Sequence, residues 1–313
     1  MAVAFVFPGQ GSQSVGMGRT LAEAFPVARA VFEEVDAALG ETLTATMWEG
    51  PADRLTLTEN AQPALMAVSL ATMRVLQAEA GVDLARDAAF VAGHSLGEYS
   101  ALAVAGSITV SDTARLLRIR GRAMQQAVPV GTGAMAALIG LEFAAASAIA
   151  AEAAQAQVCQ AANDNGGGQV VVSGDKAAVE RAVEIAKAKG AKRAMMLPVS
   201  APFHCALMRP AAGAMAEALA KVDVKPPVVP LVANVLARAI TEPGEIVRRL
   251  VEQVTGTVRW RESVAFMASA GVGTFYEVGA GKVLSGLVKR IAEGASGIAI
   301  GTPEDVTAFA MRR

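Results

Sequence analysis

Short apolar runs alternate along the chain with longer stretches in which apolar residues recur every three or four positions. The runs at 3–7, 88–92, 229–233 and 274–278 have the length of buried strands. Helical spacing is found at about 17–39, 61–80, 98–104, 207–221, 243–253, 261–271 and 282–293. Pro63 is interpreted as a first-turn proline of its helix. Strands that alternate with long helices are typical of a mainly parallel sheet covered on both faces.

The pattern changes between residues 129 and 199. Strand-like runs at 135–139, 158–162, 169–173 and 194–199 enclose helical stretches at 142–156 and 176–189. The resulting order, βαββαβ, is that of a ferredoxin-like unit. We therefore predict an α/β fold with two parts. A large unit comprises residues 1–128 and 200–313, and a small ferredoxin-like subdomain, residues 129–199, is inserted into it.

Composition removes several classes of function. Of the 313 residues, 53% are hydrophobic and 18% are charged, which excludes a disordered chain. The net charge of −1 and the 4% of aromatic residues argue against nucleic-acid binding. The longest charge-free stretch, 123–141, contains glutamines, a proline and glycines, so we expect no membrane span. Two cysteines without metal-ligand spacing indicate a reducing compartment and no metal site. We expect a cytoplasmic protein.

One motif points to nucleophilic catalysis. Gly93-His-Ser95-Leu-Gly97 matches Gly-x-Ser-x-Gly, and it follows a predicted strand and precedes a predicted helix. On such a turn the serine hydroxyl is lifted clear of the sheet, as in an α/β-hydrolase-like core, which we predict here. The same residues also fit a helix cap, because Glu98 stands three positions after the serine.

A serine nucleophile needs a base, and the chain has only two histidines. His94 adjoins Ser95, where neighbouring side chains diverge, so we interpret it as structural. His204 is the remaining candidate. Its orienting acceptor stays open among Glu262, Glu277 and Gln253. Cys205 beside His204 is a weaker alternative nucleophile.

Two further features fit this chemistry. The loop Gly9-Gln-Gly11 follows the first strand but lacks the glycine spacing of a dinucleotide or P-loop site. It could instead supply a backbone N–H group to an oxyanion. Arg120 lies on a different helix face from Arg118 and Arg122, which we predict to be solvated. A buried arginine requires an anion, either a substrate carboxylate or a structural partner such as Glu98.

Seven stretches in order carry a family resemblance: 7–13, 60–65, 93–102, 120–125, 131–136, 203–208 and 276–284. Together they resemble the malonyl-CoA:acyl-carrier-protein transacylases of bacterial fatty-acid synthesis over nearly the whole chain. The resemblance implies transfer of malonyl from malonyl-CoA to the phosphopantetheine thiol of acyl carrier protein. No cofactor is implied, because malonyl-CoA is a substrate. We expect a monomer.

The resemblance also implies residue roles. Ser95 would carry the malonyl group and His204 would act as general base and acid. Gln253 would supply an oxygen acceptor behind the histidine, from its side chain or its main chain. The backbone N–H groups of Gln10 and Leu96 would form the oxyanion hole.

The matched motifs place four residues at the substrate. Arg120 would bind the malonyl carboxylate, with Gln62 and Met124 beside it. Phe203 resembles the residue of malonyl-selecting acyltransferases that crowds a methyl branch. An acidic carrier would be steered by basic residues, for which the candidates are Lys187, Lys189, Lys192, Arg193, Lys289 and Arg290.

Two alternative hypotheses about the function remain. A serine esterase or thioesterase would use the same Ser–His chemistry with water as acceptor. A non-catalytic subunit that binds the carrier protein would need no acyl-enzyme at all.

Overall fold

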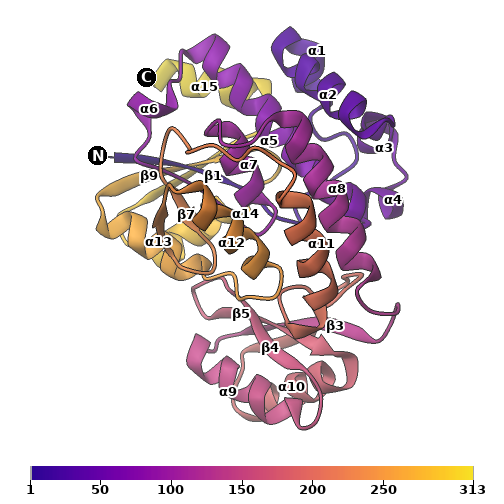
Figure 1. Cartoon of the computed structure of the whole chain (residues 1–313). Coiled ribbons are helices and arrows are strands. Elements are labelled where there is room, and N and C mark those ends of the chain that lie inside the picture. Colours follow the sequence, from indigo (N-terminus) through magenta and orange to yellow (C-terminus); the bar gives the residue numbers. More distant parts are fainter. Residues whose placement is uncertain (1, 313) are drawn as a thin grey trace.

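The structure is a computed structural model that describes residues 2–312. It contains two sheets, and Figure 1 shows the smaller one, with its helices, at one end of the molecule. The larger sheet has six strands in the order β10 (Ser296–Ile300), β9 (Val272–Val278), β1 (Ala2–Phe7), β2 (Phe90–Gly93), β7 (Leu231–Ala233) and β8 (Arg238–Ile240). All neighbours are parallel except β7 and β8. The predicted α/β architecture with a mainly parallel sheet is confirmed.

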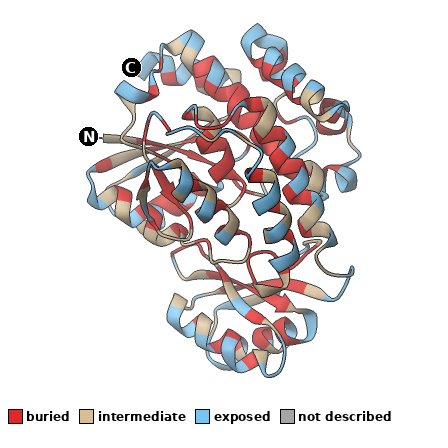
Figure 2. Ribbon diagram, viewed as in Figure 1, coloured by how far each residue is buried: buried red, intermediate tan, exposed pale blue. Residues whose placement is uncertain are grey.

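Helices lie on both sides of this sheet, as the apolar pattern predicts. In Figure 2 buried residues fill the inner strands, and outward helix faces are exposed. The helices before the small sheet are α1 (Arg19–Ala24), α2 (Pro26–Leu39), α3 (Leu43–Glu49), α4 (Ala52–Thr56), α5 (Thr58–Ala80), α6 (Leu84–Asp87), α7 (Gly97–Val104) and α8 (Val110–Gln126). Those after it are a 3-10 turn (Ala206–Met208), α11 (Arg209–Leu219), α12 (Pro243–Gln253), α13 (Trp260–Ser269), α14 (Val283–Ile291) and α15 (Pro303–Arg312).

The smaller sheet is formed by the predicted βαββαβ stretch. Its elements are β3 (Gly133–Ile139), α9 (Phe143–Ala154), β4 (Cys159–Asp164), β5 (Gln169–Asp175), α10 (Lys176–Ala188) and β6 (Arg193–Met196). The strands are antiparallel in the order β4-β5-β3-β6, and α9 and α10 share their own apolar core with them. The order of elements is confirmed, whereas the subdomain boundaries at 129 and 199 stay a prediction.

Prolines account for two differences from the expected helices. The stretch at 17–39 is two helices, because Pro26 disfavours a helical conformation at Phe25, which is extended with φ −129°. The interpretation of Pro63 as a first-turn proline is wrong, because α5 begins at Thr58 and Pro63 lies inside it. A proline there leaves the carbonyl of Glu59 without its helical partner, and the Arg118 guanidinium donates to that oxygen at 2.6 Å.

The predicted solvation of Arg118 is therefore also wrong. Its side chain is 7% exposed and pairs with Glu41, and it donates to Asn60 Oδ1 at 2.5 Å. The elements that the pattern did not predict are mostly short and include β8 and β10. No helix within residues 2–312 has the length and apolar character needed to cross a membrane.

Candidate active site

The Gly-x-Ser-x-Gly motif forms a tight turn between β2 and α7. Ser95 has φ 55°, a left-handed conformation that non-glycine residues rarely adopt. A Cβ atom on Gly93 would lie 1.9 Å from the Gly97 carbonyl carbon, and one on Gly97 would lie 2.2 Å from the Phe7 oxygen. Both positions require glycine, because the turn packs against itself and against β1. The turn therefore presents the Ser95 hydroxyl at the carboxyl end of the sheet.

His204 stands directly beside this hydroxyl. Its Nε2 atom lies 2.8 Å from Ser95 Oγ, and its Nδ1 atom lies 2.8 Å from the main-chain oxygen of Gln253. Nδ1 therefore donates to the carbonyl, which leaves Nε2 as an acceptor for the serine proton. Burial, followed by the positive charge of Arg120, lowers the pKa of His204 to about 3. The imidazole is consequently neutral, as a proton acceptor must be.

The acceptor left open by the sequence is the Gln253 carbonyl. Gln253 is the last residue of α12, where main-chain oxygens lack an intrahelical partner. The two glutamates that were alternatives are engaged elsewhere. Glu262 pairs with Arg259, and Glu277 accepts hydrogen bonds from the start of α14.

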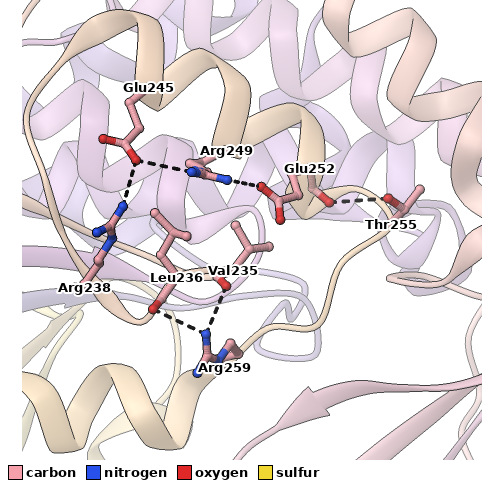
Figure 3. Close-up of polar contacts among 8 residues, drawn as sticks. All are labelled: Val235, Leu236, Arg238, Glu245, Arg249, Glu252, Thr255 and Arg259. Carbon is pink, nitrogen blue, oxygen red and sulfur yellow. Dashed lines mark hydrogen bonds and ion pairs between the residues drawn. The ribbon is translucent and has the colours of Figure 1, made fainter.

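A chain of surface ion pairs ties α12 to the neighbouring strand (Figure 3). Glu245 lies 3.2 Å from Arg238 of β8 and 3.4 Å from Arg249, which in turn contacts Glu252 at 2.6 Å. The pairs are partly exposed, so each contributes modestly to stability. Only the Arg238–Glu245 pair links α12 to another element, and it does so at the first turn of the helix, whereas the pairs of Arg249 lie within α12.

Arg120 is the only arginine beside the serine among the described residues that line the cavity. The residue is 1% exposed, and its guanidinium donates from one nitrogen to Gln62 Oε1 at 2.7 Å. The other terminal nitrogen donates to Ser95 Oγ at 3.1 Å and to Gln253 Oε1 at 2.8 Å. Three of five N–H donors are thereby used, and Nε makes no hydrogen bond. The guanidinium thus has two N–H groups without a protein acceptor, one on the buried Nε and one on the nitrogen that contacts Gln62.

Two residues that the sequence reasoning did not assign to the site hold this arrangement. Asn234 accepts from the Ser95 N–H at 2.8 Å and donates to the Gly93 carbonyl at 2.7 Å, which fixes both sides of the turn. Glu98 accepts from Gln253 Nε2 at 2.7 Å. Burial raises the pKa of Glu98 to about 7. The only sequence signal for Asn234 is its place at the end of a strand that neighbours β2.

Asn234 is itself held by the start of α13. The Arg259 N–H donates to the Asn234 carbonyl at 3.0 Å. The Arg259 guanidinium contacts the carbonyls of Val235 and Leu236 at 3.4 Å each, as Figure 3 shows. The turn after β7 is therefore braced from one side, so that the Asn234 amide can be positioned accurately.

Two backbone N–H groups near the hydroxyl are free of protein acceptors in the described chain. Around the turn, the N–H groups of Ser95, Gly97 and Glu98 are engaged, whereas that of Leu96 is not. The N–H of Gln10 is also unused. A Cβ on Gly9 would lie 2.7 Å from the His94 carbonyl, so glycine allows the Gln10 loop to approach the turn closely.

A cavity of about 430 Å³ opens over these groups. Seven of the predicted site residues besides the serine line it: Gln10, Gln62, Leu96, Arg120, Met124, Phe203 and His204. The small sheet contributes Met135, Asn163 and Val171 to the opposite wall. Gln253 does not line the cavity and lies behind the imidazole. The structure therefore brings the predicted residues together at one serine, between the two sheets.

The remaining candidates lie outside the reaction path. His94 is half-buried and borders the cavity, but its Nε2 lies 2.9 Å from Asn165 Oδ1, in keeping with a structural histidine. Cys205 is fully buried, contacts the Pro202 carbonyl, and has a pKa raised by burial. A buried neutral thiol is a poor nucleophile. Within residues 2–312 no group of three or more metal-binding side chains is close enough to hold an ion.

Gly121 determines how closely α8, which carries Arg120, approaches α5. A Cβ at this position would lie 2.5 Å from Glu59 Cα and 2.7 Å from the Thr58 oxygen. We expect Gly121→Ala to destabilise the protein by about 1–3 kcal/mol, because the two helices must separate. The melting temperature should fall by a few degrees, and the contact between Arg120 and Gln62 should weaken.

Gly213→Ala is the matched control. Gly213 is exposed within α11, and nothing lies within 4 Å of an added Cβ. There alanine should stabilise the helix by about 1 kcal/mol at most. A higher melting temperature for both variants would contradict the tight contact at Gly121.

Comparisons with known proteins agree with this site. The chain is 50% identical to the malonyl CoA-acyl carrier protein transacylase of Escherichia coli K12, over 97% of both chains. It superimposes on the acyl-carrier-protein S-malonyltransferase of Bartonella henselae with a TM-score of 0.97 at 56% identity, covering 100% and 99% of the two chains. It also superimposes on a malonyl-transacylase solved in complex with a type II PKS acyl-carrier protein. The TM-score is 0.96 at 44% identity, and 100% of both chains is covered. The acyl transferase domain model matches residues 4–302, and the chain belongs to that family.

Proposed function

We propose that the protein transfers the malonyl group of malonyl-CoA to the phosphopantetheine thiol of acyl carrier protein through a malonyl ester of Ser95. The observation that carries this proposal is the buried Arg120 guanidinium, 3.1 Å from Ser95 Oγ. A cation beside the nucleophile suits an acyl group with a second, charged carboxylate. The names of the relatives from Escherichia coli and Bartonella henselae support the same activity.

In the first half-reaction, Ser95 Oγ attacks the thioester carbonyl and its proton passes to His204 Nε2. The Gln253 carbonyl stabilises the imidazolium by accepting from Nδ1. The N–H groups of Gln10 and Leu96 bind the tetrahedral oxyanion. Collapse of the intermediate breaks the carbon–sulfur bond, and His204 returns the proton to the departing thiol of coenzyme A.

The second half-reaction reverses these steps with a different thiol. The phosphopantetheine thiol gives its proton to His204 and attacks the malonyl ester. The same two N–H groups hold the oxyanion. Ser95 then leaves with the proton from His204. The scheme predicts ping-pong kinetics, because one product departs before the second substrate reacts.

The side chains that line the cavity determine which acyl group the protein accepts. Arg120 binds the malonyl carboxylate, and Gln62 orients the guanidinium. Met124 lies beside Gln62, with its sulfur 3.7 Å from the amide nitrogen. Phe203 is almost buried in the cavity wall and would crowd a methyl branch on the acyl group. These contacts favour malonyl over methylmalonyl.

The fold class, the absence of a cofactor, the location and the oligomeric state belong to the same proposal. The large sheet is hydrolase-like, since its nucleophile stands on a strand–turn–helix, and residues 129–199 form the inserted unit. The protein works without a cofactor, as a cytoplasmic monomer.

Of the basic residues considered for carrier docking, Lys187 and Lys189 are paired with glutamates. The exposed candidates that keep no ion pair in the described chain are Lys192, Arg193, Lys289 and Arg290.

The direct test is intact-mass analysis of the protein mixed with malonyl-CoA. We expect one malonyl adduct that persists in buffer and disappears when holo acyl carrier protein is added, as the carrier gains the same mass. An adduct lost equally fast without carrier would indicate a hydrolase. Carrier binding without any adduct would indicate a non-catalytic subunit.

Arg120→Ala tests the carboxylate contact. We expect kcat/KM for malonyl-CoA to fall by about 10² to 10³, because a buried charged contact to the substrate is lost. The rate with acetyl-CoA, which lacks the carboxylate, should be spared or should increase. Equal losses for both substrates would contradict the assignment of Arg120.

A further inference from the structure

A chain of hydrogen bonds connects the carboxylate site to the loop proposed as the oxyanion donor. Gln62 accepts from Arg120 through Oε1 at 2.7 Å and donates through Nε2 to Thr58 Oγ1 at 2.9 Å. Thr58 in turn donates its hydroxyl proton to Gln10 Oε1 at 2.9 Å. We call these four side chains the Thr58 bridge.

The donors and acceptors of the bridge determine the direction of the hydrogen bonds from Arg120 to Thr58. A guanidinium has donors and no acceptor, so Gln62 must face Arg120 with its oxygen. The amide nitrogen of Gln62 then points at Thr58, whose oxygen must accept. The single hydroxyl proton is therefore available for Gln10, whose side-chain oxygen receives it. The charge at Arg120 thus sets the orientation of Gln62, and in the structure the hydroxyl proton of Thr58 is directed at Gln10 Oε1.

The Thr58 hydroxyl cannot form a hydrogen bond with solvent water in place of its protein partners. Thr58 is fully buried at the first turn of α5, one turn before Gln62 on the same face. Gly121 allows α8 to contact the backbone of α5 at Thr58 itself. Leaving the Thr58 hydroxyl or the Gln62 amide without a hydrogen bond would therefore destabilise the fold, because both side chains are shielded from solvent.

We propose that Thr58 is a positioning residue that links malonyl selection to the geometry of the oxyanion loop. Its hydroxyl holds the Gln62 amide in the orientation that presents oxygen to Arg120. The same hydroxyl holds the Gln10 side chain and so the loop whose N–H faces the reacting carbonyl. Thr58 itself does not line the cavity. This inference rests on the function proposed above.

Thr58→Val, which retains the shape and removes the hydroxyl, is the test. We expect the ratio of kcat/KM for malonyl-CoA to that for acetyl-CoA to fall by about tenfold, since one buried hydrogen bond no longer fixes the Gln62 amide. The rate with acetyl-CoA should fall less, through the loosened Gln10 side chain alone. Thr58→Ser restores the hydroxyl and should restore the ratio. Thr58→Ala provides a second variant without the hydroxyl if the valine variant misfolds.

Thr72→Val is the matched control. Thr72 is also fully buried on α5, but its hydroxyl donates only to the Val68 carbonyl of the same helix, at 2.8 Å. Its loss should leave the malonyl-to-acetyl ratio unchanged even if the melting temperature falls. A merely structural role for Thr58 would likewise lower stability without changing the ratio.

The outcomes separate this inference from the proposed function. If the wild-type protein forms no malonyl adduct, the function itself fails. If the wild type transfers malonyl and Thr58→Val keeps the wild-type ratio, only the inference about Thr58 is overturned. A lowered ratio that Thr58→Ser does not recover would also overturn it, because the hydroxyl would then not be the cause.

Discussion

Ser95→Ala should abolish the malonyl adduct and lower the transfer rate by about 10⁴ to 10⁶, because among the described residues His204 Nε2 contacts no other hydroxyl. Alanine keeps the Cβ atom and so places no new atom in the tight turn between Gly93 and Gly97. The turn is also held from outside by Asn234, which bonds the backbone of residue 95 and not its side chain. The variant should therefore fold like the wild type.

The measurement is intact-mass labelling with malonyl-CoA, followed by peptide mapping of the adduct. Ser100→Ala is a suitable control. Ser100 lies on α7 shortly after the nucleophile, is fully buried, and its hydroxyl makes no hydrogen bond. That variant should label normally. Labelling of Ser95→Ala at another residue, with Cys205 as the obvious candidate, would refute the assignment of the nucleophile.

His204→Ala should lower both half-reactions by about 10³ to 10⁴, since a general base and acid is lost from each. Single-turnover acylation and deacylation, measured separately, should show comparable losses. Gln253→Ala provides the contrast. It keeps the carbonyl that accepts from Nδ1 and removes only the side chain, which holds Arg120 and Glu98. A loss as large for Gln253→Ala as for His204→Ala would contradict the main-chain assignment.

The pH dependence follows from the lowered pKa of His204. The basic, neutral imidazole is the active form, and burial with the nearby Arg120 charge brings its pKa to about 3. Lowering the pH from 7 to 5 should therefore leave the imidazole neutral, whereas an ordinary histidine would lose most of its activity. The Glu98 carboxyl, whose pKa is about 7, titrates in the same range, so a flat profile of kcat/KM against pH is expected in Glu98→Gln. In Arg120→Ala the neighbouring charge is gone, so the acidic limb should move to higher pH. A limb near pH 6.5 that persists in Glu98→Gln would contradict this account.

The sequence predicted the parts of the site that carry a local signature. Ser95 stands in a five-residue motif, and His204 is the one histidine not adjacent to it. The helix-face argument identifies Arg120, although the same argument places Arg118 in solvent, which is wrong. That error has a physical origin. Pro63 leaves the Glu59 carbonyl without a helical N–H donor, and the buried Arg118 guanidinium donates to it instead. Helix periodicity does not reveal such a defect in the facing helix.

The supporting residues could not be found in this way. Asn234 acts on a turn that is 139 residues away in the chain, and Thr58 acts on a loop that is 48 residues away. Their amide and hydroxyl groups are common in any sequence and gain meaning only through packing. The choice of the Gln253 carbonyl over two glutamates depends on where a helix ends, and the sequence left all three open.

The use of a peptide carbonyl behind His204 has an evolutionary consequence. Every amino acid carries that oxygen, so mutation of codon 253 cannot delete the partner of the imidazole. The side chain of the same residue is a separate matter, because it is buried and contacts Arg120 and Glu98. A substitution of Gln253 would therefore disturb the surroundings of Arg120 while leaving the acceptor of the His204 proton in place.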